Sequence, residues 1–296
     1  METRPFVPWD MMNSFMIDVF VKYGVPKEDA RICADVLLES DRRGIESHGC
    51  NRFKPIYLDR IDKGTLLPVT KIDIVKETPT TVVMDANNGM GMVASYHMME
   101  KLIEKAKTYG MAGGTIFNST HYGIAGYWTT MAEKAGMIGI SGTNARPSVA
   151  PTFGVEPMMG TNPLTFTMPT DEDFPFNFDC ATSIVQNGKI EFYERSGKDE
   201  NGNNRMYRLG HFFFVINPEF FMGLDTFEHT AGGILRGLRD SEKAPGAERI
   251  YTAGEKEWLA WQERKDKGVP VGESIQKELT GLRDRFGLDY KFPFES

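Results

Sequence analysis

Residues 81–117 read TVVMDANNGMGMVASYHMMEKLIEKAKTYGMAGGTIF, and they suggest the architecture of the whole chain. Alternating apolar residues predict a strand over Thr81 to Met84, and helical spacing predicts a helix over Tyr96 to Thr108. A second short strand is expected from Gly114 to Phe117. Strands and helices that alternate in this way are typical of α/β proteins. We therefore expect an α/β (α+β) protein with a mixed sheet.

The turn before this helix contains Gly89-Met-Gly91-Met-Val-Ala94, which matches the loose G-x-G-x-x-A form of a dinucleotide-binding fingerprint. Two features argue against that function. Four residues separate the strand from Gly89, and the next strand is followed by Asn118, where the fingerprint requires an acidic residue that binds the ribose. We favour an ordinary glycine-rich turn over a Rossmann phosphate loop.

Helical periodicity dominates both ends of the chain. Three helices are expected near the N-terminus: one after Asp10, one from Pro26 to Gly44 and one from Ser47 to Gly64. Three more are expected near the C-terminus: Phe227 to Arg239, Gly254 to Lys267 and Val271 to Phe286. We expect residues 1–70 and 235–296 to form a helical domain, and residues 71–234 to form a cofactor-binding α/β domain.

The middle of the chain supplies the remaining elements of the sheet. A helix is expected from Ile124 to Ala135. Further strands are expected at Ile72 to Val75, Met137 to Ile140, Leu164 to Met168, Ile190 to Tyr193 and Phe212 to Ile216.

The composition restricts the partners and the location. A formal charge of −7 and a pI near 5.4 disfavour nucleic acid as a partner, because its binding usually rests on a basic surface. No apolar run approaches the roughly 18–20 residues that cross a bilayer, and the first ten residues lack the features of a signal peptide. Three scattered cysteines argue against a disulfide framework. We expect a cytoplasmic protein that binds neither nucleic acid nor membranes.

Ile45 to Arg52 reads IESHGCNR and contains the first candidate catalytic group. Ser47 is expected to cap the third helix, which would place His48 in its first turn and Arg52 one turn later on the same face. The guanidinium could bind a carboxylate while the imidazole faces the adjacent hydroxyl or carbonyl group of the same ligand. Taken alone, this motif is more often a capped helix with an exposed histidine and a surface ion pair.

Asn118 to Gly123 reads NSTHYG and forms a second histidine loop, between a predicted strand and a predicted helix. His121 precedes glycines that let a ligand approach the backbone closely. A lone loop histidine more often satisfies neighbouring carbonyl groups than takes part in catalysis. Two such loops favour acid–base chemistry, because the ordinary pKa of an imidazole, about 6.5, lies near neutral pH.

Two more motifs place small polar groups at predicted turns: Gly160-Thr-Asn-Pro163 and Asp179-Cys-Ala-Thr-Ser183. Their hydroxyl and amide groups suit a ribose or a phosphate, although each motif alone is ordinary turn chemistry. The histidines show no spacing typical of metal ligands, so we expect no metal site. The remaining three, His97, His211 and His229, are interpreted as structural.

Several short motifs follow one another in an order that is informative: S-H-G-x-x-R (47–52), N-S-T-H-Y-G (118–123), N-A-R-P (144–147), V-A-P (149–151), G-T-N-P (160–163) and D-x-A-T-S (179–183). Together they resemble the type-2 malate/L-lactate dehydrogenase family, which includes ureidoglycolate, sulfolactate and diketogulonate enzymes. The resemblance covers most of residues 10–195 and, more weakly, Gly210 to Phe214 and Tyr251 to Glu257. It implies an NAD(P)-dependent oxidoreductase of 2-hydroxy or 2-oxo acids, a non-Rossmann cofactor fold and a homodimer.

The resemblance also implies roles for single residues. His48 and His121 match the two positions proposed in different members as the acid–base residue. Ser47, Arg52 and Arg146 match contacts to the substrate or to a cofactor phosphate. The implied cofactor contacts are Asn118, Asn144, Thr161, Asn162, Asp179, Cys180, Ala181 and Thr182.

The sequence departs from the family after the strand expected at Ile190 to Tyr193. Family members continue there with a long segment that includes Gly-Lys-Gly and contributes a lysine to the site. Here Lys198 is followed by DENGN and then directly by Asn204 to Gly210. Either the chain carries a deletion, or the sequence omits disordered residues and joins the flanking segments. We favour the second explanation, because DENGN itself resembles part of the segment that is missing.

We therefore expect reversible hydride transfer between a nicotinamide cofactor, NAD or NADP, and a small 2-hydroxy or 2-oxo acid, with malate and oxaloacetate first. One of the two histidines would exchange the hydroxyl proton, and we favour His48 because Arg52 is expected beside it. The alternative is a catalytically inactive family member that only binds a nucleotide or an organic acid. A true deletion near Lys198 would favour that alternative.

Overall fold

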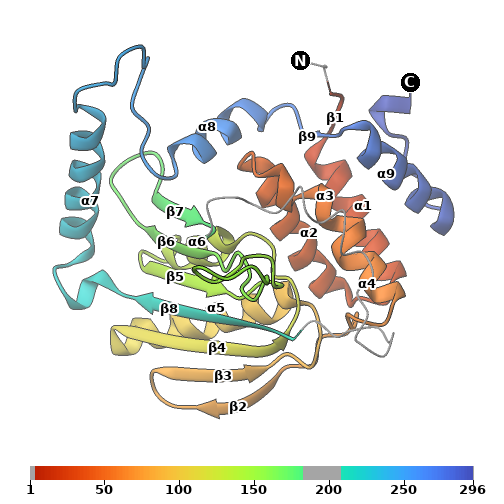
Figure 1. The fold of residues 1–296 in the computed structure, drawn as a ribbon, viewed down its shortest axis with the longest axis horizontal. Coiled ribbons are helices and arrows are strands. Elements are labelled where there is room, and N and C mark those ends of the chain that lie inside the picture. Colours follow the sequence, from red (N-terminus) through yellow and green to blue (C-terminus); the bar gives the residue numbers. More distant parts are fainter. Residues whose placement is uncertain (1–3, 183–207, 296) are drawn as a thin grey trace.

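A seven-stranded mixed sheet forms the centre of the computed structural model, which describes residues 4–182 and 208–295 (Figure 1). The strands lie in the order β2-β3-β4-β8-β5-β6-β7. Within the described strands of this sheet, β3 and β4 are the one parallel pair, and the other neighbours are antiparallel. The strands are β2 (Asp73–Glu77), β3 (Thr81–Asp85), β4 (Met111–Ser119), β5 (Ile138–Thr143), β6 (Leu164–Met168), β7 (Phe176–Cys180) and β8 (Leu209–Ile216). The predicted α/β class and the mixed sheet are confirmed.

Two helices cover one face of the sheet. α5 (Gly91–Tyr109) packs on β4 and β8, and α6 (Ala125–Glu133) packs on β5 and β6. Alternate strand residues point into this layer, where Phe213 of β8 and Trp128 of α6 are fully buried. Burial of a large apolar side chain stabilises the fold by about 1.5–3 kcal/mol, so this layer holds the sheet and its helices as one unit.

The two ends of the chain meet beside the sheet. α2 (Lys27–Arg42) packs on α5, and α1 (Trp9–Lys22) contacts α9 (Glu273–Phe286). β1 (Phe6–Val7) pairs with β9 (Val269–Pro270), and α8 (Glu255–Arg264) contacts α2. α7 (Leu224–Arg239) lies at the opposite end of the sheet (Figure 1). The division into two domains stays a prediction, and its expected boundary at residue 235 falls inside α7.

The third expected helix is wrong as a single element. It is divided into a 3₁₀ turn (Glu46–His48), α3 (Cys50–Arg52), a π-helical segment (Phe53–Leu58) and α4 (Asp59–Asp62). Gly49 has φ −88° and ψ −133°, which ends the first turn before α3 begins. Pro55 has no N–H to donate to the α-helical ladder, in agreement with the wider π turn around it.

Two other expectations need comment. Asp179 and Cys180, expected at a turn, are the last residues of the edge strand β7, which pairs with β6 along its whole length. The expected strand at Ile190 to Tyr193 and the departure that begins at Lys198 lie outside the described residues. In the described part of the chain, no helix is long and apolar enough to cross a membrane.

The glycine-rich turn before α5 packs against the protein itself. The Gly91 N–H donates to Thr120 Oγ1 at 3.0 Å, and a Cβ at Gly91 would lie 2.2 Å from the Thr120 carbonyl oxygen. The loop after β4 therefore occupies the N-terminus of α5, where a Rossmann fold binds phosphate. This packing agrees with the expectation of a non-Rossmann fold.

Candidate active site

The imidazoles of His48 and His121 stack on each other. Their ring centroids lie 5.9 Å apart, with 24° between the ring planes. His48 ends the 3₁₀ turn that follows α2, and His121 lies in the loop between β4 and α6. The packing of α2 on α5 and α6 brings these distant segments together. The two predicted catalytic residues therefore share one place in the fold.

Ser47 and Arg52 take positions that differ from the expected ones. Ser47 does not cap a helix: its Oγ lies 2.9 Å from His48 Nδ1. Arg52 is separated from His48 by Gly49, so the two are not on one helical face, but Arg52 Nε donates to the Ser47 carbonyl oxygen at 2.7 Å. The guanidinium thus stays beside the histidine turn although the expected helix is absent.

Asp41, which sequence reasoning missed, stabilises the turn that carries His48 through a hydrogen bond to the backbone. Its Oδ2 accepts a hydrogen bond from the Cys50 N–H at 2.8 Å, so the carboxylate caps the start of α3. Burial raises the pKa of Asp41 to about 7, although hydrogen bonds from Cys50 act in the opposite direction. An aspartate at the end of a predicted helix gave no sign of this function in the sequence.

The C-terminal part of the chain fastens the same turn. Arg264 of α8 donates to the Asp41 carbonyl oxygen at 2.9 Å and to Glu46 Oε1 at 2.6 Å. Arg4 forms a second ion pair with Glu46. Both chain ends thus restrain the segment that carries His48.

His121 is held from its Nδ1 side. Tyr57 Oη lies 2.6 Å from Nδ1, and the Gly123 N–H donates to the same nitrogen at 3.1 Å. Burial, and next the neighbouring side chains of His48, Arg60 and Arg52, hold the pKa of His121 well below its usual range. His121 is therefore a neutral imidazole near neutral pH. Tyr57 and Arg60 were missed by sequence reasoning, because both occupy buried positions in a predicted helix.

His211 of β8 connects the ends of strands β4 and β5. Its Nε2 lies 2.8 Å from Ser119 Oγ and its Nδ1 lies 2.7 Å from Thr143 Oγ1. The ring of Tyr122 stacks on it with centroids 4.3 Å apart. Burial lowers the pKa of His211 to about 3, so it is an uncharged bridge between β4 and β5. These contacts agree with its interpretation as a structural residue.

The residues expected to contact a cofactor gather where β5, β6, β7 and β8 end or begin. Asn144 Oδ1 accepts from the Gly210 N–H at 2.7 Å, and Asn162 Oδ1 accepts from the Ala145 N–H at 2.9 Å. The Thr182 N–H donates to the Thr161 carbonyl oxygen at 2.9 Å. These hydrogen bonds order the loops at this end of the four strands. Arg146 lies on the loop that follows Asn144, and Ala181 follows β7.

Two expected cofactor residues make their own protein contacts. Asn118 has a φ of 48°, and its Nδ2 lies 3.1 Å from each carboxylate oxygen of Asp85. Asp179 Oδ2 accepts the Gly126 N–H at 2.8 Å at the start of α6. Asn118 lies at the end of β4, just before the His121 loop, and Asp179 contacts the start of α6, the helix that follows this loop. Amide and hydroxyl groups with an arginine nearby form a donor set that fits the ribose and phosphate oxygens of a nicotinamide dinucleotide.

The sequence matches the family described as Malate/L-lactate dehydrogenase over residues 7–201 and 198–280. The chain belongs to this family. The two matched segments overlap at residues 198–201, which is where the sequence is expected to depart from the family pattern.

Individual members of this dehydrogenase family are similar over nearly the whole chain. A malate dehydrogenase of Pyrococcus horikoshii is 35% identical, covering 96% of each chain. An L-sulfolactate dehydrogenase of Methanocaldococcus jannaschii is 32% identical, covering 94% of this chain and 96% of the relative. The crystal structure of malate dehydrogenase from Entamoeba histolytica superimposes with a TM-score of 0.91 at 37% identity, covering 98% of this chain and all of the other. The protein is a dehydrogenase that acts on hydroxy acids with a nicotinamide cofactor.

Proposed function

We propose that the protein oxidises malate to oxaloacetate, and catalyses the reverse reaction, with NAD or NADP as the hydride carrier. The observation that supports this proposal is the contact between His48 and His121, with the Arg52 guanidinium beside them. An imidazole can accept and return the proton of a secondary alcohol near neutral pH. A guanidinium group can bind the carboxylates of a small dicarboxylic acid. Malate dehydrogenases are also among its most similar relatives.

The proposed roles follow from these positions. Arg52 and Arg146 bind carboxylate or phosphate oxygens, and Ser47 orients His48 through its ring nitrogen. His48 takes the hydroxyl proton during oxidation and returns it during reduction. Asn118, Asn144, Thr161, Asn162 and Asp179 to Thr182 hold the dinucleotide. When bound, the nicotinamide ring accepts the hydride in oxidation and supplies it in reduction.

A substrate panel tests the proposal. Oxaloacetate, pyruvate, sulfopyruvate and a ureidoglycolate-derived 2-oxo acid are each offered with NADH and with NADPH, and the nicotinamide absorbance is followed. We expect the highest kcat/KM with oxaloacetate. A clear preference for another acid would overturn the choice of malate, and no turnover with any pair would favour an inactive member that only binds its ligands.

We further propose that the chain acts as a homodimer joined through the uncovered face of the sheet. The helices α5 and α6 cover one face, and in the view of Figure 1 they lie behind the strands. Most strand residues that point to the other face are apolar: Met111, Phe117, Ile138, Ile140, Leu164, Phe166, Met168, Phe176, Phe178, Phe212, Phe214 and Ile216. An apolar sheet face of this extent is unusual on a monomer. A second copy supplies an equally apolar and uncharged partner.

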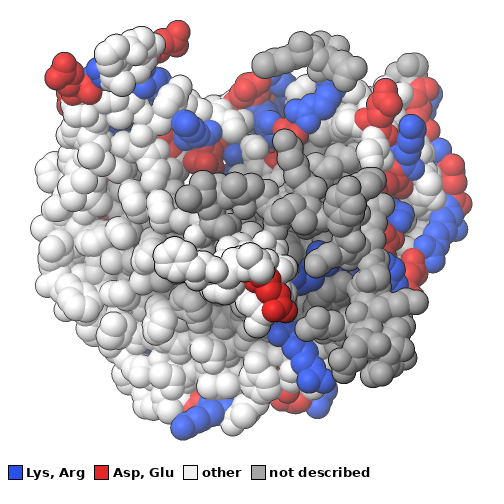
Figure 2. Space-filling model, in the orientation of Figure 1, with Lys and Arg blue, Asp and Glu red and all other residues white. Residues whose placement is uncertain are grey.

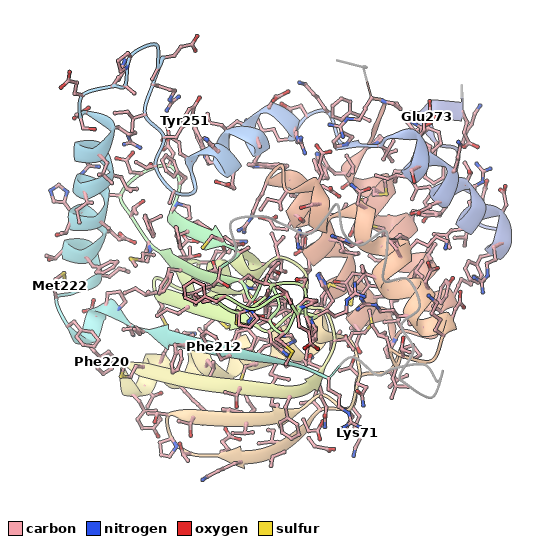
Figure 3. The ribbon with its side chains drawn as sticks, viewed as in Figure 1. Lys71, Phe212, Phe220, Met222, Tyr251 and Glu273 are labelled. Carbon is pink, nitrogen blue, oxygen red and sulfur yellow. The ribbon has the colours of Figure 1, made fainter. Side chains whose placement is uncertain are left out.

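Neighbouring elements extend this surface. The left part of the view in Figure 2 shows few charged side chains among the described residues. Phe220 and Met222 lie at the turn between β8 and α7, beyond the end of the strand that carries Phe212 (Figure 3), and both are more than half exposed at 55% and 53%. Phe153 and Val155, between β5 and β6, are almost completely exposed. Contact with a second copy would remove these side chains from water.

A further inference from the structure

The hydrogen bonds at one nitrogen of His121 distinguish the roles of the two histidines. A neutral imidazole carries its proton on one ring nitrogen and accepts a hydrogen bond at the other. His121 Nδ1 lies 3.1 Å from the Gly123 backbone nitrogen, with the N–H directed at it. A backbone N–H can only donate, so Nδ1 must offer its lone pair.

Tyr57 completes this arrangement. Its hydroxyl lies 2.6 Å from the same Nδ1, and its ring meets the imidazole edge-on with centroids 5.7 Å apart. Tyr57 is fully buried, and burial raises the pKa of its phenol, so the hydroxyl keeps its proton and can donate it. A proton on Nδ1 would instead point at the hydrogen of the Gly123 N–H. Both neighbours therefore favour the tautomer with the proton on Nε2.

The charges around His121 favour the neutral ring as well. Arg52 of α3 and Arg60 of α4 each disfavour a positive charge there, and so does His48 of the 3₁₀ turn when it is protonated. His211 of β8 lies nearby as an uncharged ring. Both stacked imidazoles are partly exposed. Because the Nδ1 of His121 is occupied by its neighbours and its ring is held neutral, His48 is the imidazole that can take up the proton.

We propose that Tyr57 and the Gly123 amide fix His121 as the Nε2–H tautomer, so that His121 donates a hydrogen bond to the substrate oxygen while His48 exchanges the proton. Tyr57 is then a positioning residue, because it acts through His121. This inference rests on the proposed dehydrogenase chemistry at this site and assigns separate tasks to the two histidines.

The proton balance is simple. In oxidation, the hydroxyl proton passes to His48, the C2–H bond breaks as its hydrogen leaves as the hydride that a bound nicotinamide would accept, and C2–O becomes a carbonyl. Throughout, the Nε2–H of His121 remains on its nitrogen and stabilises negative charge that develops on the substrate oxygen. In reduction, the His48 imidazolium returns the proton while His121 polarises the carbonyl group.

Nuclear magnetic resonance tests the tautomer without any turnover. The full chain is labelled with ¹⁵N-histidine, and the His121 signals are assigned by their loss in His121→Asn. We expect an unprotonated Nδ1 and a protonated Nε2, unchanged across the neutral pH range. A proton on Nδ1 in the wild-type protein would overturn the proposal. Because no substrate is needed, this result is independent of which acid the enzyme oxidises.

The variant Tyr57→Phe tests the positioning residue. We expect a mixture of His121 tautomers and a kcat lowered roughly tenfold, as for the loss of one hydrogen bond that acts in the transition state. Tyr127→Phe is the matched control. Tyr127 of α6 also donates a hydrogen bond through its hydroxyl, but to Asp35 of α2, at 2.8 Å. Equal kinetics and an unchanged tautomer in Tyr57→Phe would show that Tyr57 does not position His121.

The pH dependence of kcat/KM for oxidation separates the two histidines. The acidic limb of this profile should persist in Tyr57→Phe and in His121→Gln, whose amide N–H can still donate. The same limb should disappear in His48→Gln, because the proton acceptor is gone. A limb that disappears in His121→Gln and persists in His48→Gln would reverse the assignment.

Discussion

The backbone of Gly49 lies directly against the carboxylate of Asp41: a Cβ at Gly49 would lie 2.1 Å from Asp41 Oδ1. Gly49 follows His48, and the same carboxylate caps Cys50. The glycine of the S-H-G motif is therefore required by packing, because it lets the histidine turn rest on the end of α2. The conformation of this turn depends on Asp41, which lies eight positions before Gly49 in the sequence.

Gly49→Ala should disturb this packing. We expect it to lower the free energy of unfolding by about 1–3 kcal/mol, the usual cost of a side chain that does not fit a packed site. It should also reduce kcat/KM, because His48 must move with the turn. Gly281→Ala in α9 is the control: nothing lies within 4 Å of its added Cβ, and alanine favours the helix. Urea denaturation and steady-state kinetics measure both effects, and equal results for the two variants would contradict the packing argument.

Asp41 predicts a pH dependence of stability. Burial raises its pKa from 3.8 to about 7, so the folded state binds this proton more tightly than the unfolded state. Its contribution to stability is complete below about pH 4 and is lost as the pH rises through 7. Asp41→Asn keeps an oxygen that accepts the hydrogen bond from Cys50, but its amide group cannot ionise. Relative to the wild type, the variant should gain about 2–3 kcal/mol between pH 5 and pH 8.

Urea denaturation at the two pH values measures this difference. A constant difference between Asp41→Asn and the wild type would show that the carboxyl group titrates normally in the folded protein.

The stacked histidines predict the largest losses of activity. His48→Asn and His121→Asn should each lower kcat for malate oxidation by at least about 100-fold, as removal of an acid–base group or its hydrogen-bond donor usually does. His97→Asn should leave the rate unchanged, because His97 lies exposed on α5 beside Glu100. Steady-state kinetics with saturating cofactor measure the three variants. Near-native rates for both site variants would refute the proposed active site.

The uncovered sheet face predicts the oligomeric state. Phe214 of β8 is 49% exposed in the isolated chain, and Phe214→Asp would place a charge within the proposed interface. We expect a dimer for the wild type and mainly monomer for the variant, measured by light scattering during size-exclusion chromatography. Val21→Asp is the control, because Val21 has a similar exposure of 42% but lies on the helix α1 and not on the sheet. A dimer that survives Phe214→Asp would place the interface elsewhere.

Much of the secondary structure follows from local patterns. The expected strand at Leu164 to Met168 matches β6 residue for residue, and the helix after Asp10 is present as α1. In α1 the apolar residues repeat at helical spacing because one face packs on the core. In β6 they alternate with threonines, and it is the threonines that face the helices. The third helix failed, since Gly49 and Pro55 interrupt a periodic apolar pattern that continues through them.

The order of the short motifs in the chain was sufficient to recognise the family and to select His48 and His121 as candidates. Their contact, the donors at His121 Nδ1 and the buried Asp41 carboxylate became visible only in three dimensions. The physical reason is how far apart in the chain the interacting residues lie. Apolar periodicity reports which side of an element faces the core, whereas hydrogen bonds and pKa values depend on which distant segments the packing of α2, α5 and β8 brings within a few ångströms.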